Sequence, residues 1–265
     1  MRRVWRALPT LLKVGVAEMV AYRTEFLIWV LTSTMPLIML ALMLAVARDA
    51  PIQGYGSEDL VAYYLVTLLV RQLTGSWVVW EMTYDIRQGS MGLKLLRPIS
   101  PLVIYAVESL AAIPMRGIVA LPMTVALLYF AGASEVALAP LPIVLVLAAT
   151  AAAWLISFLL SAVIGTLAYF VDSAISIHNV YYGVFMVLSG YLLPLAMFPP
   201  WLSAANAFLP FAYQLSVPVE IATGRLAGTA ALHAVGEAWL WVILLGGLLT
   251  LGWRAGLRRY VAFGG

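Results

Sequence analysis

Six long apolar runs, separated by short polar segments, most constrain what this chain can fold into. A helix that crosses a bilayer needs about 20 consecutive, mostly apolar residues. The chain is 64% hydrophobic and only 10% charged, whereas soluble domains are about half apolar and about a quarter charged. The sequence therefore predicts an all-α, polytopic membrane protein, a single transmembrane domain over residues 1–265. Its six predicted transmembrane helices cover residues 26–46, 60–80, 105–130, 141–170, 179–198 and 238–253.

The segment before the first run has a different pattern. In residues 2–24, Trp5, Leu8, Leu12 and Val16 recur at helical spacing, while most charged residues occupy other positions. This pattern is typical of an amphipathic helix that lies in the membrane interface with its basic side chains toward the headgroups. The alternative is a poorly ordered basic tail.

The positions of Lys and Arg predict the orientation, because basic residues near span ends collect on the cytoplasmic side. Only Arg48 and Arg225 fall on the side opposite to the N-terminus. Both termini and the polar stretch after the second run are therefore expected in the cytoplasm. The basic residues on that side are Arg2, Arg3, Arg6, Lys13, Arg23, Arg87, Lys94, Arg97, Arg254, Arg258 and Arg259.

The residue types needed for several common chemistries are missing. The chain has no cysteine, and its only histidines, His178 and His233, lie far apart. It contains no G-x-x-x-x-G-K-[S/T] phosphate loop, so ATP is not expected to bind to this chain through one. We therefore expect no catalytic residues, no metal site, no cofactor on this chain and no nucleic-acid partner.

The stretch 85–101, DIRQGSMGLKLLRPISP, is the most compact polar pattern between two apolar runs. One interpretation is a solvated turn, which needs basic residues but no particular spacing. The other is a short surface helix bounded by Gly89 and Pro98, which presses Met91, Leu95 and Leu96 into a partner, with Arg87 and Arg97 beside them.

Two sequence blocks resemble type-2 ABC transporter permeases, in particular the six-span branch of about 260 residues whose ATPase is a separate chain. The stretch 85–101 is similar to that family's coupling loop at Asp85, Ile86, Arg87, Gly89, Leu95, Leu96, Arg97, Pro98, Ser100 and Pro101. The segment 199–236, with the residue before it, resembles the short re-entrant helices on the family's outer side. It matches at Phe198, Pro199, Pro200, Trp201, Leu209, Pro210 and Phe211.

The resemblance implies the permease subunit of an ATP-driven exporter in the inner membrane of a prokaryote. Two permeases, either a homodimer or a heterodimer with a sister permease, would pair with two copies of an ABC ATPase that hold ATP and Mg²⁺. The stretch 85–101 would form the coupling helix, and the expected substrate is hydrophobic or amphipathic.

The prolines of the segment 199–236 remove backbone donors and interrupt helices. Non-helical backbone at membrane depth is tolerated where protein covers it or where it lines a cavity. A re-entrant outer gate with an apolar plug fits this pattern. An extracellular loop with aromatic residues at the headgroup level is the alternative.

Arg71, Glu108 and Arg116 lie inside apolar runs. A charge at such depth costs free energy, so it should face the bundle interior and find a partner. Glu108 can pair with Arg71 on the neighbouring helix. Alternatively, one arginine lines a transport path and receives an anionic group of the substrate.

Two other functions stay open on the residues alone. A secondary transporter driven by an ion gradient usually has internal repeats and midplane acidic residues, and neither is evident here. A membrane scaffold would use the stretch 85–101 to recruit a soluble partner without any transport.

Overall fold

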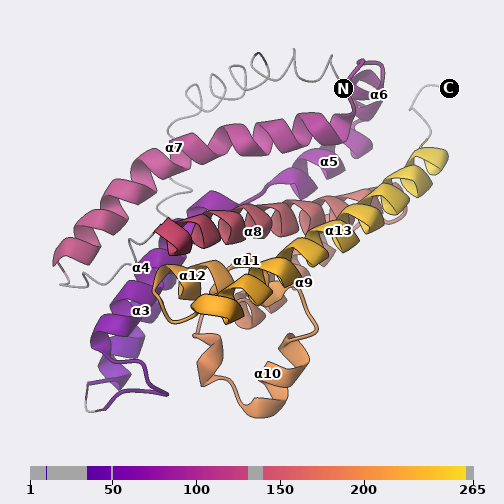
Figure 1. Ribbon diagram of the computed structural model, residues 1–265. Coiled ribbons are helices and arrows are strands. Elements are labelled where there is room, and N and C mark those ends of the chain that lie inside the picture. Colours follow the sequence, from indigo (N-terminus) through magenta and orange to yellow (C-terminus); the bar gives the residue numbers. More distant parts are fainter. Residues whose placement is uncertain (1–9, 11–34, 49, 131–139, 261–265) are drawn as a thin grey trace.

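The computed structural model describes residues 10, 35–48, 50–130 and 140–260 of the chain (Figure 1). The regular structure of these residues is helical, apart from one isolated bridge between Ile52 and Tyr55. The expected all-α class is confirmed for this part of the chain. The predicted interfacial helix, residues 2–24, lies outside the described residues except for Thr10, as does the first part of the 26–46 span.

The helices follow one another with short connections. Their bounds are α3 Met35–Val46, α4 Ser57–Thr74, α5 Val78–Arg87, α6 Met91–Leu95, α7 Pro101–Phe130, α8 Pro140–Thr166, α9 Ala174–Leu188, α10 Pro200–Asn206, α11 Phe211–Gln214, α12 Ser216–Ala222 and α13 Gly228–Arg259. Short 3-10 turns, Leu167–Tyr169 and Leu195–Met197, follow α8 and precede α10.

Three of the described helices contain segments long and apolar enough to cross a membrane. These segments are Pro101–Ile118 in α7, Pro142–Tyr169 in and just after α8, and Gly228–Arg259 in α13. The helices α3 and α9 are apolar but shorter. The apolar helices agree with a membrane protein, and the number of six crossings stays a prediction.

The predicted 60–80 span is two helices rather than one. Helix α4 ends at Thr74, Gly75 is extended (φ −65°, ψ 137°), and α5 begins at Val78. Glycine and serine favour a helix less than most residues, and the pair Gly75–Ser76 stands at this break. The Arg116 guanidinium donates to the Gly75 carbonyl at 2.7 Å, which satisfies an acceptor that the broken helix leaves open.

The predicted 179–198 span is also shorter, because α9 ends at Leu188. Gly190 follows with φ +87°, a left-handed conformation that glycine adopts without a steric cost. Its carbonyl accepts a 2.7 Å hydrogen bond from the Tyr63 hydroxyl, and a Cβ on Gly190 would stand 2.5 Å from that oxygen. Gly190 therefore leaves room for Tyr63 of α4 just after the end of α9.

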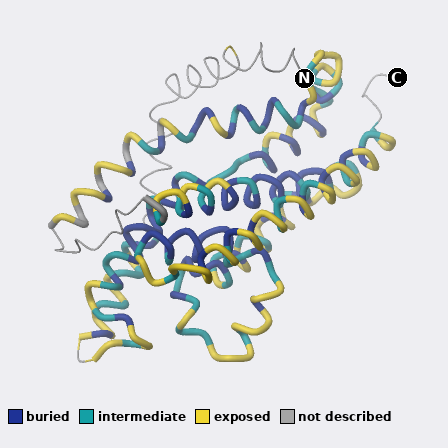
Figure 2. Tube along the Cα trace, viewed as in Figure 1, coloured by how far each residue is buried: buried dark blue, intermediate teal, exposed yellow. Residues whose placement is uncertain are grey.

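Helix α8 is the centre of the fold. It contacts α13, α4, α5, α11 and α12, and Figure 2 shows it mostly buried. Its small side chains let neighbouring helices approach closely: Ala152 and Ala162 are fully buried, and a Cβ on Gly165 would lie 3.0 Å from the Met82 sulfur. In contrast, α13 exposes an apolar face, Leu240, Ile243, Leu244, Leu248 and Leu251, as a lipid-facing helix would.

The molecule has two distinct ends. Helix α6 and the last turn of α13 lie at one end, and α10 and the connection from α3 to α4 lie at the other (Figure 1). The stretch 85–101 and α10 of the outer segment are thus at opposite ends of the molecule, while α11 and α12 lie against α8.

Candidate functional site

The short helix expected between Gly89 and Pro98 is present as α6. Gly89 has φ +76°, a conformation that lets the chain turn sharply from α5 into α6. At the far side, Pro101 is the first residue of α7, a position that proline favours because its missing N–H would have no partner there. The stretch 85–101 therefore has a defined structure, in which a turn at Gly89 leads from α5 into the short helix α6 and the chain then enters α7 at Pro101.

A buried carboxylate holds the base of α6. The Asp85 side chain is 9% exposed and pairs with the Lys94 ammonium at 2.5 Å. It also accepts hydrogen bonds from the Ser90 hydroxyl, at 2.6 Å, and from the Tyr105 hydroxyl. Burial by itself would raise the pKa of Asp85, but the hydrogen bonds from Lys94, Ser90 and Tyr105 and the Lys94 charge outweigh burial and lower it. Asp85 thus joins α5, α6 and α7.

The end of the chain holds α6 from the other side. The Tyr260 hydroxyl accepts the Gly92 N–H at 3.0 Å and donates to the Gly89 carbonyl at 3.0 Å. The Tyr260 ring stands edge-on to that of Tyr169, with 5.9 Å between centroids. Because Tyr260 directly follows α13, this contact ties the last helix to α6. Sequence reasoning missed Tyr260, which lies 168 residues from Gly92.

Helix α6 presents an exposed apolar surface at its tip. The side chains of Leu93 and Leu96 are 70% and 83% exposed, and Leu95 is 37% exposed. Arg97 and Pro98 are exposed as well. We call Leu93, Leu95, Leu96 and Arg97 the α6 tip.

The structure corrects the expected contact face of this helix. Met91 is fully buried in the core of the same chain, so the expectation that it contacts a partner is wrong. Leu93, which was not singled out, is exposed in its place. Met91 turns inward because Tyr105 and the rest of that core cluster lie on its side of α6.

Three other residues of the stretch 85–101 make contacts within the same chain. Arg87 pairs with Asp172 and donates to the Val171 carbonyl at 2.8 Å, so it links α5 to the turn before α9. Ile86 and Pro101 are buried. These residues support the base of α6 and are separate from its tip.

The outer segment 199–236 divides into two parts. Pro199 and Pro200 start α10, which stands out from the body with Trp201 70% exposed (Figure 1). After it, Pro210 is buried, and α11 and α12 contact α8. Phe198, Leu209 and Phe211 are half-buried. The role of this segment as a gate stays a prediction.

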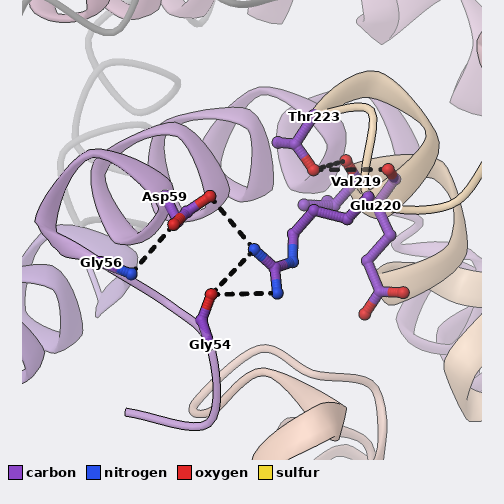
Figure 3. Close-up of polar contacts among 7 residues, drawn as sticks. Gly54, Gly56, Asp59, Val219, Glu220 and Thr223 are labelled. Carbon is purple, nitrogen blue, oxygen red and sulfur yellow. Dashed lines mark hydrogen bonds and ion pairs between the residues drawn. The ribbon is translucent and has the colours of Figure 1, made fainter. Parts of the chain in front are cut away.

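A surface ion pair fastens the outer segment to α4. The guanidinium of Arg225 contacts the Asp59 carboxylate at 3.1 Å and the Gly54 carbonyl at 3.3 Å (Figure 3). It also lies 3.6 Å from the centre of the Tyr55 ring. Asp59 accepts the Gly56 N–H at 2.9 Å, which caps the start of α4.

The intramembrane arginines lie together, but the expected pair of Arg71 with Glu108 is not among the ion pairs of the described residues. Arg71 lies four residues before Gly75, which contacts Arg116, whereas Glu108 lies eight residues before Arg116 on α7. At about 1.5 Å per residue, Glu108 is about 12 Å along α7 from that contact. Arg71 lies instead over the rings of Tyr182 and Phe185 in α9, at 5.6 and 5.2 Å from their centres.

Comparison with known proteins identifies the family. Residues 30–264 match the family model described as ABC-2 family transporter protein, which covers most of the chain. The comparisons find no significant match among curated proteins or among solved structures. The matched region contains the helices α3 to α13, with both the α6 tip and the outer segment. The chain belongs to the ABC-2 transporter family, and its apolar helices and family membership make it a membrane permease component of an ABC transporter.

Proposed function

We propose that this chain is the permease of an ATP-driven exporter, and that the α6 tip docks on a separate ABC ATPase. Two permeases, identical or a sister pair, and two ATPase subunits form the complex, and ATP and Mg²⁺ bind to the ATPase. The complex exports a hydrophobic or amphipathic substrate across a prokaryotic inner membrane.

The two-sided construction of α6 carries this proposal. Its outer side exposes Leu93 and Leu96 at the end of the bundle, an apolar surface that suits a protein groove. Its inner side is held by the ion pair of Lys94 with Asp85, which also accepts a hydrogen bond from Tyr105 of α7, and by the hydrogen bond from Gly92 to Tyr260, just after α13. A coupling element needs both a contact surface and a stiff attachment, whereas a simple solvated turn needs neither.

The attachments define a route for motion. When nucleotide binding closes the ATPase dimer, displacement of α6 passes through Asp85 and Tyr105 to α7, and through Tyr260 to α13. The break between α4 and α5 lets α5 follow α6. In thermodynamic terms, ATP shifts the population between two arrangements of the helices because it binds them with different affinity.

The docking experiment uses the tagged chain, isolated in mild detergent from its native membrane, with identification of the proteins that co-purify. Wild type should recover an ABC ATPase, and Arg97→Glu should lose most of it because charge is reversed in the α6 tip. Arg48→Glu is the matched control, since Arg48 is exposed near the opposite end of the bundle and should not affect recovery.

Other outcomes would decide against the proposal. Equal ATPase recovery and transport in Arg97→Glu would exclude α6 as the docking element. Recovery of the chain alone, with transport in vesicles that lack ATP, would identify a secondary transporter. A partner without ATPase activity, and no transport, would identify a scaffold.

A further inference from the structure

Two arginines meet at the break between α4 and α5. Arg116 lies near the middle of α7, and Arg71 is in the last turn of α4. A Cβ built on Gly75 would stand 2.9 Å from the Arg116 Nη1 atom and 3.6 Å from the Arg71 Nη1 atom. Both guanidinium groups therefore converge beside one residue.

The described residues only partly compensate this double positive charge, through the Glu81 carboxylate, which acts electrostatically on Arg116. Neither arginine belongs to an ion pair of the described part of the chain. The Gly75 carbonyl takes one donor of Arg116, which is 6% exposed, and a guanidinium has five. The carbonyl end of α4 offers some compensation, but two like charges in a poorly hydrated region repel each other.

The surroundings suit an anion that carries an apolar part. Guanidinium groups bind phosphate and carboxylate with paired hydrogen bonds. The rings of Tyr182 and Phe185 lie against Arg71. These rings give an apolar surrounding to the Arg71 guanidinium.

Polar atoms near these rings add capacity for binding. The His178 ring lies 6.5 Å from the Tyr182 ring and 4.6 Å from the Trp80 ring. His178 is 5% exposed, and its Nδ1 atom has no hydrogen-bond partner among the described residues. A buried polar atom without a partner is costly, and a bound headgroup would supply one.

We propose that Arg71 and Arg116 form a binding site for the anionic headgroup of an amphipathic molecule, most suitably a phosphate. The inference rests on the proposed function, in which this molecule is the exported substrate. It assigns the arginines a role in recognition and restricts the substrate class to anionic amphiphiles.

The test measures equilibrium binding of radiolabelled dodecyl phosphate to the full chain, purified in an uncharged detergent. Arg71→Gln should weaken binding by about ten- to a hundredfold, the range expected for a lost hydrogen bond to a charged group. Arg71→Lys, which keeps the charge, should recover part of the affinity. Arg48→Gln removes an exposed arginine outside the site and should bind like wild type.

Competitors define the ligand. Dodecyltrimethylammonium should not compete, because its headgroup is a cation. Inorganic phosphate should compete much more weakly than dodecyl phosphate, and equal competition would overturn the amphipathic part of the proposal. Competition by phosphatidylglycerol would identify a lipid as the source of the anion. If phosphatidylglycerol does not compete, the source is a soluble amphiphile, and either result supports the shared headgroup chemistry.

Binding of dodecyl phosphate that is unchanged in Arg71→Gln would overturn the site. Arg71→Gln is the decisive variant, because substitution of Arg116 would also remove the hydrogen bond to the Gly75 carbonyl and could disturb the fold. Gel filtration of each variant checks that it is folded. The binding test needs no ATPase. Failure of the anion site therefore leaves the docking result intact, and failure to recover an ATPase leaves the binding result intact.

Discussion

Asp85 and Tyr260 attach α6 to the rest of the molecule through a few polar groups. Asp85 is a buried charge, but it is paired with Lys94 and receives two hydroxyl hydrogen bonds. The single hydroxyl of Tyr260 makes two hydrogen bonds, one with Gly92 of α6 and one with Gly89 in the turn before it. Hydrogen bonds contribute about 0.5–1.5 kcal/mol each, so single substitutions here should loosen α6 without unfolding the protein.

Tyr260→Phe removes the hydroxyl and keeps the ring against Tyr169. We expect the Gly92 amide to exchange its hydrogen faster, by about fivefold or more, because it loses the Tyr260 hydroxyl and keeps only the Gly89 carbonyl, at 3.1 Å, as an acceptor. Hydrogen exchange with mass spectrometry measures this on peptides that cover α6. Tyr84→Phe is the control, since Tyr84 is 65% exposed. Unchanged exchange of Gly92 in Tyr260→Phe would contradict the attachment.

Asp85→Asn should destabilise the protein at pH 7, because the amide cannot replace the ion pair with Lys94. A loss of about 1–3 kcal/mol corresponds to a thermal midpoint lower by several degrees. The pKa of folded Asp85 is below its ordinary value of 3.8. Its contribution is therefore complete above pH 3.8 and is lost as pH falls through the folded pKa.

Thermal unfolding of wild type and Asp85→Asn, compared between pH 7 and pH 3, checks this dependence. The difference between the two proteins should stay constant down to about pH 4 and shrink below it. A difference that already disappears between pH 7 and pH 5 would show that Asp85 is not held in the ionised form.

At the scale of elements, glycines decide where helices turn and how closely they approach. Gly89 permits the turn into α6 through its positive φ. Gly256 in α13 has no room for a side chain, because a Cβ there would overlap the Tyr169 ring. Other glycines of α13, such as Gly246, would place a Cβ in open space, so the same helix offers matched comparisons.

Gly89→Pro should keep the protein inserted in the membrane but uncouple ATP hydrolysis from transport. Proline holds φ near −65°, which is incompatible with the turn before α6 and would misplace the α6 tip. Transport and ATPase activity of the reconstituted complex are measured together. Gly117→Ala is the control, because a Cβ on Gly117 meets nothing within 4 Å. Normal coupled transport in Gly89→Pro would remove the coupling role.

Gly256→Ala should lower the yield of folded protein, since the methyl group forces α13 away from Tyr169. Overpacking of this kind costs about 1–3 kcal/mol. The fraction of monodisperse protein on gel filtration gives the readout. Gly246→Ala on the same helix should behave like wild type. An equal loss of folded protein in both variants would show that the loss does not come from contact with Tyr169.

At the scale of the whole molecule, the two ends of the bundle should face opposite sides of the membrane. The α6 tip lies at one end and α10 at the other (Figure 1). The excess of basic residues predicts that the α6 end is cytoplasmic. This orientation also places the α6 tip where a soluble ATPase can reach it.

Single cysteines test this orientation directly, because the natural chain contains none. Phe208→Cys, at an 81% exposed position, should react with a membrane-impermeant maleimide added to intact spheroplasts. Leu96→Cys should react only after the membrane is opened. Labelling of Leu96→Cys from outside would reverse the predicted orientation and exclude docking of a cytoplasmic ATPase on α6.

The sequence by itself determined the features that depend on neighbours along the chain. Long apolar runs specify helices that need a membrane or a protein interior. Helices α7 and α8 follow the predicted spans 105–130 and 141–170 closely, whereas α13, Gly228–Arg259, extends beyond the predicted span 238–253 at both ends. Gly89 and Pro98 bound α6 as the local backbone preferences of these residues require. In each case the signal lies within a few residues of its effect.

Only the tertiary structure decided which side chains meet. Helical spacing alone could not tell that Met91 turns inward while Leu93 faces out, because the deciding neighbours, such as Tyr105, belong to other helices. At the break after α4, Arg116 from α7 donates to the Gly75 carbonyl, and α6 is held by Tyr260, 168 residues from Gly92. These contacts join distant residues, so packing of whole helices, which no local pattern encodes, brings them together.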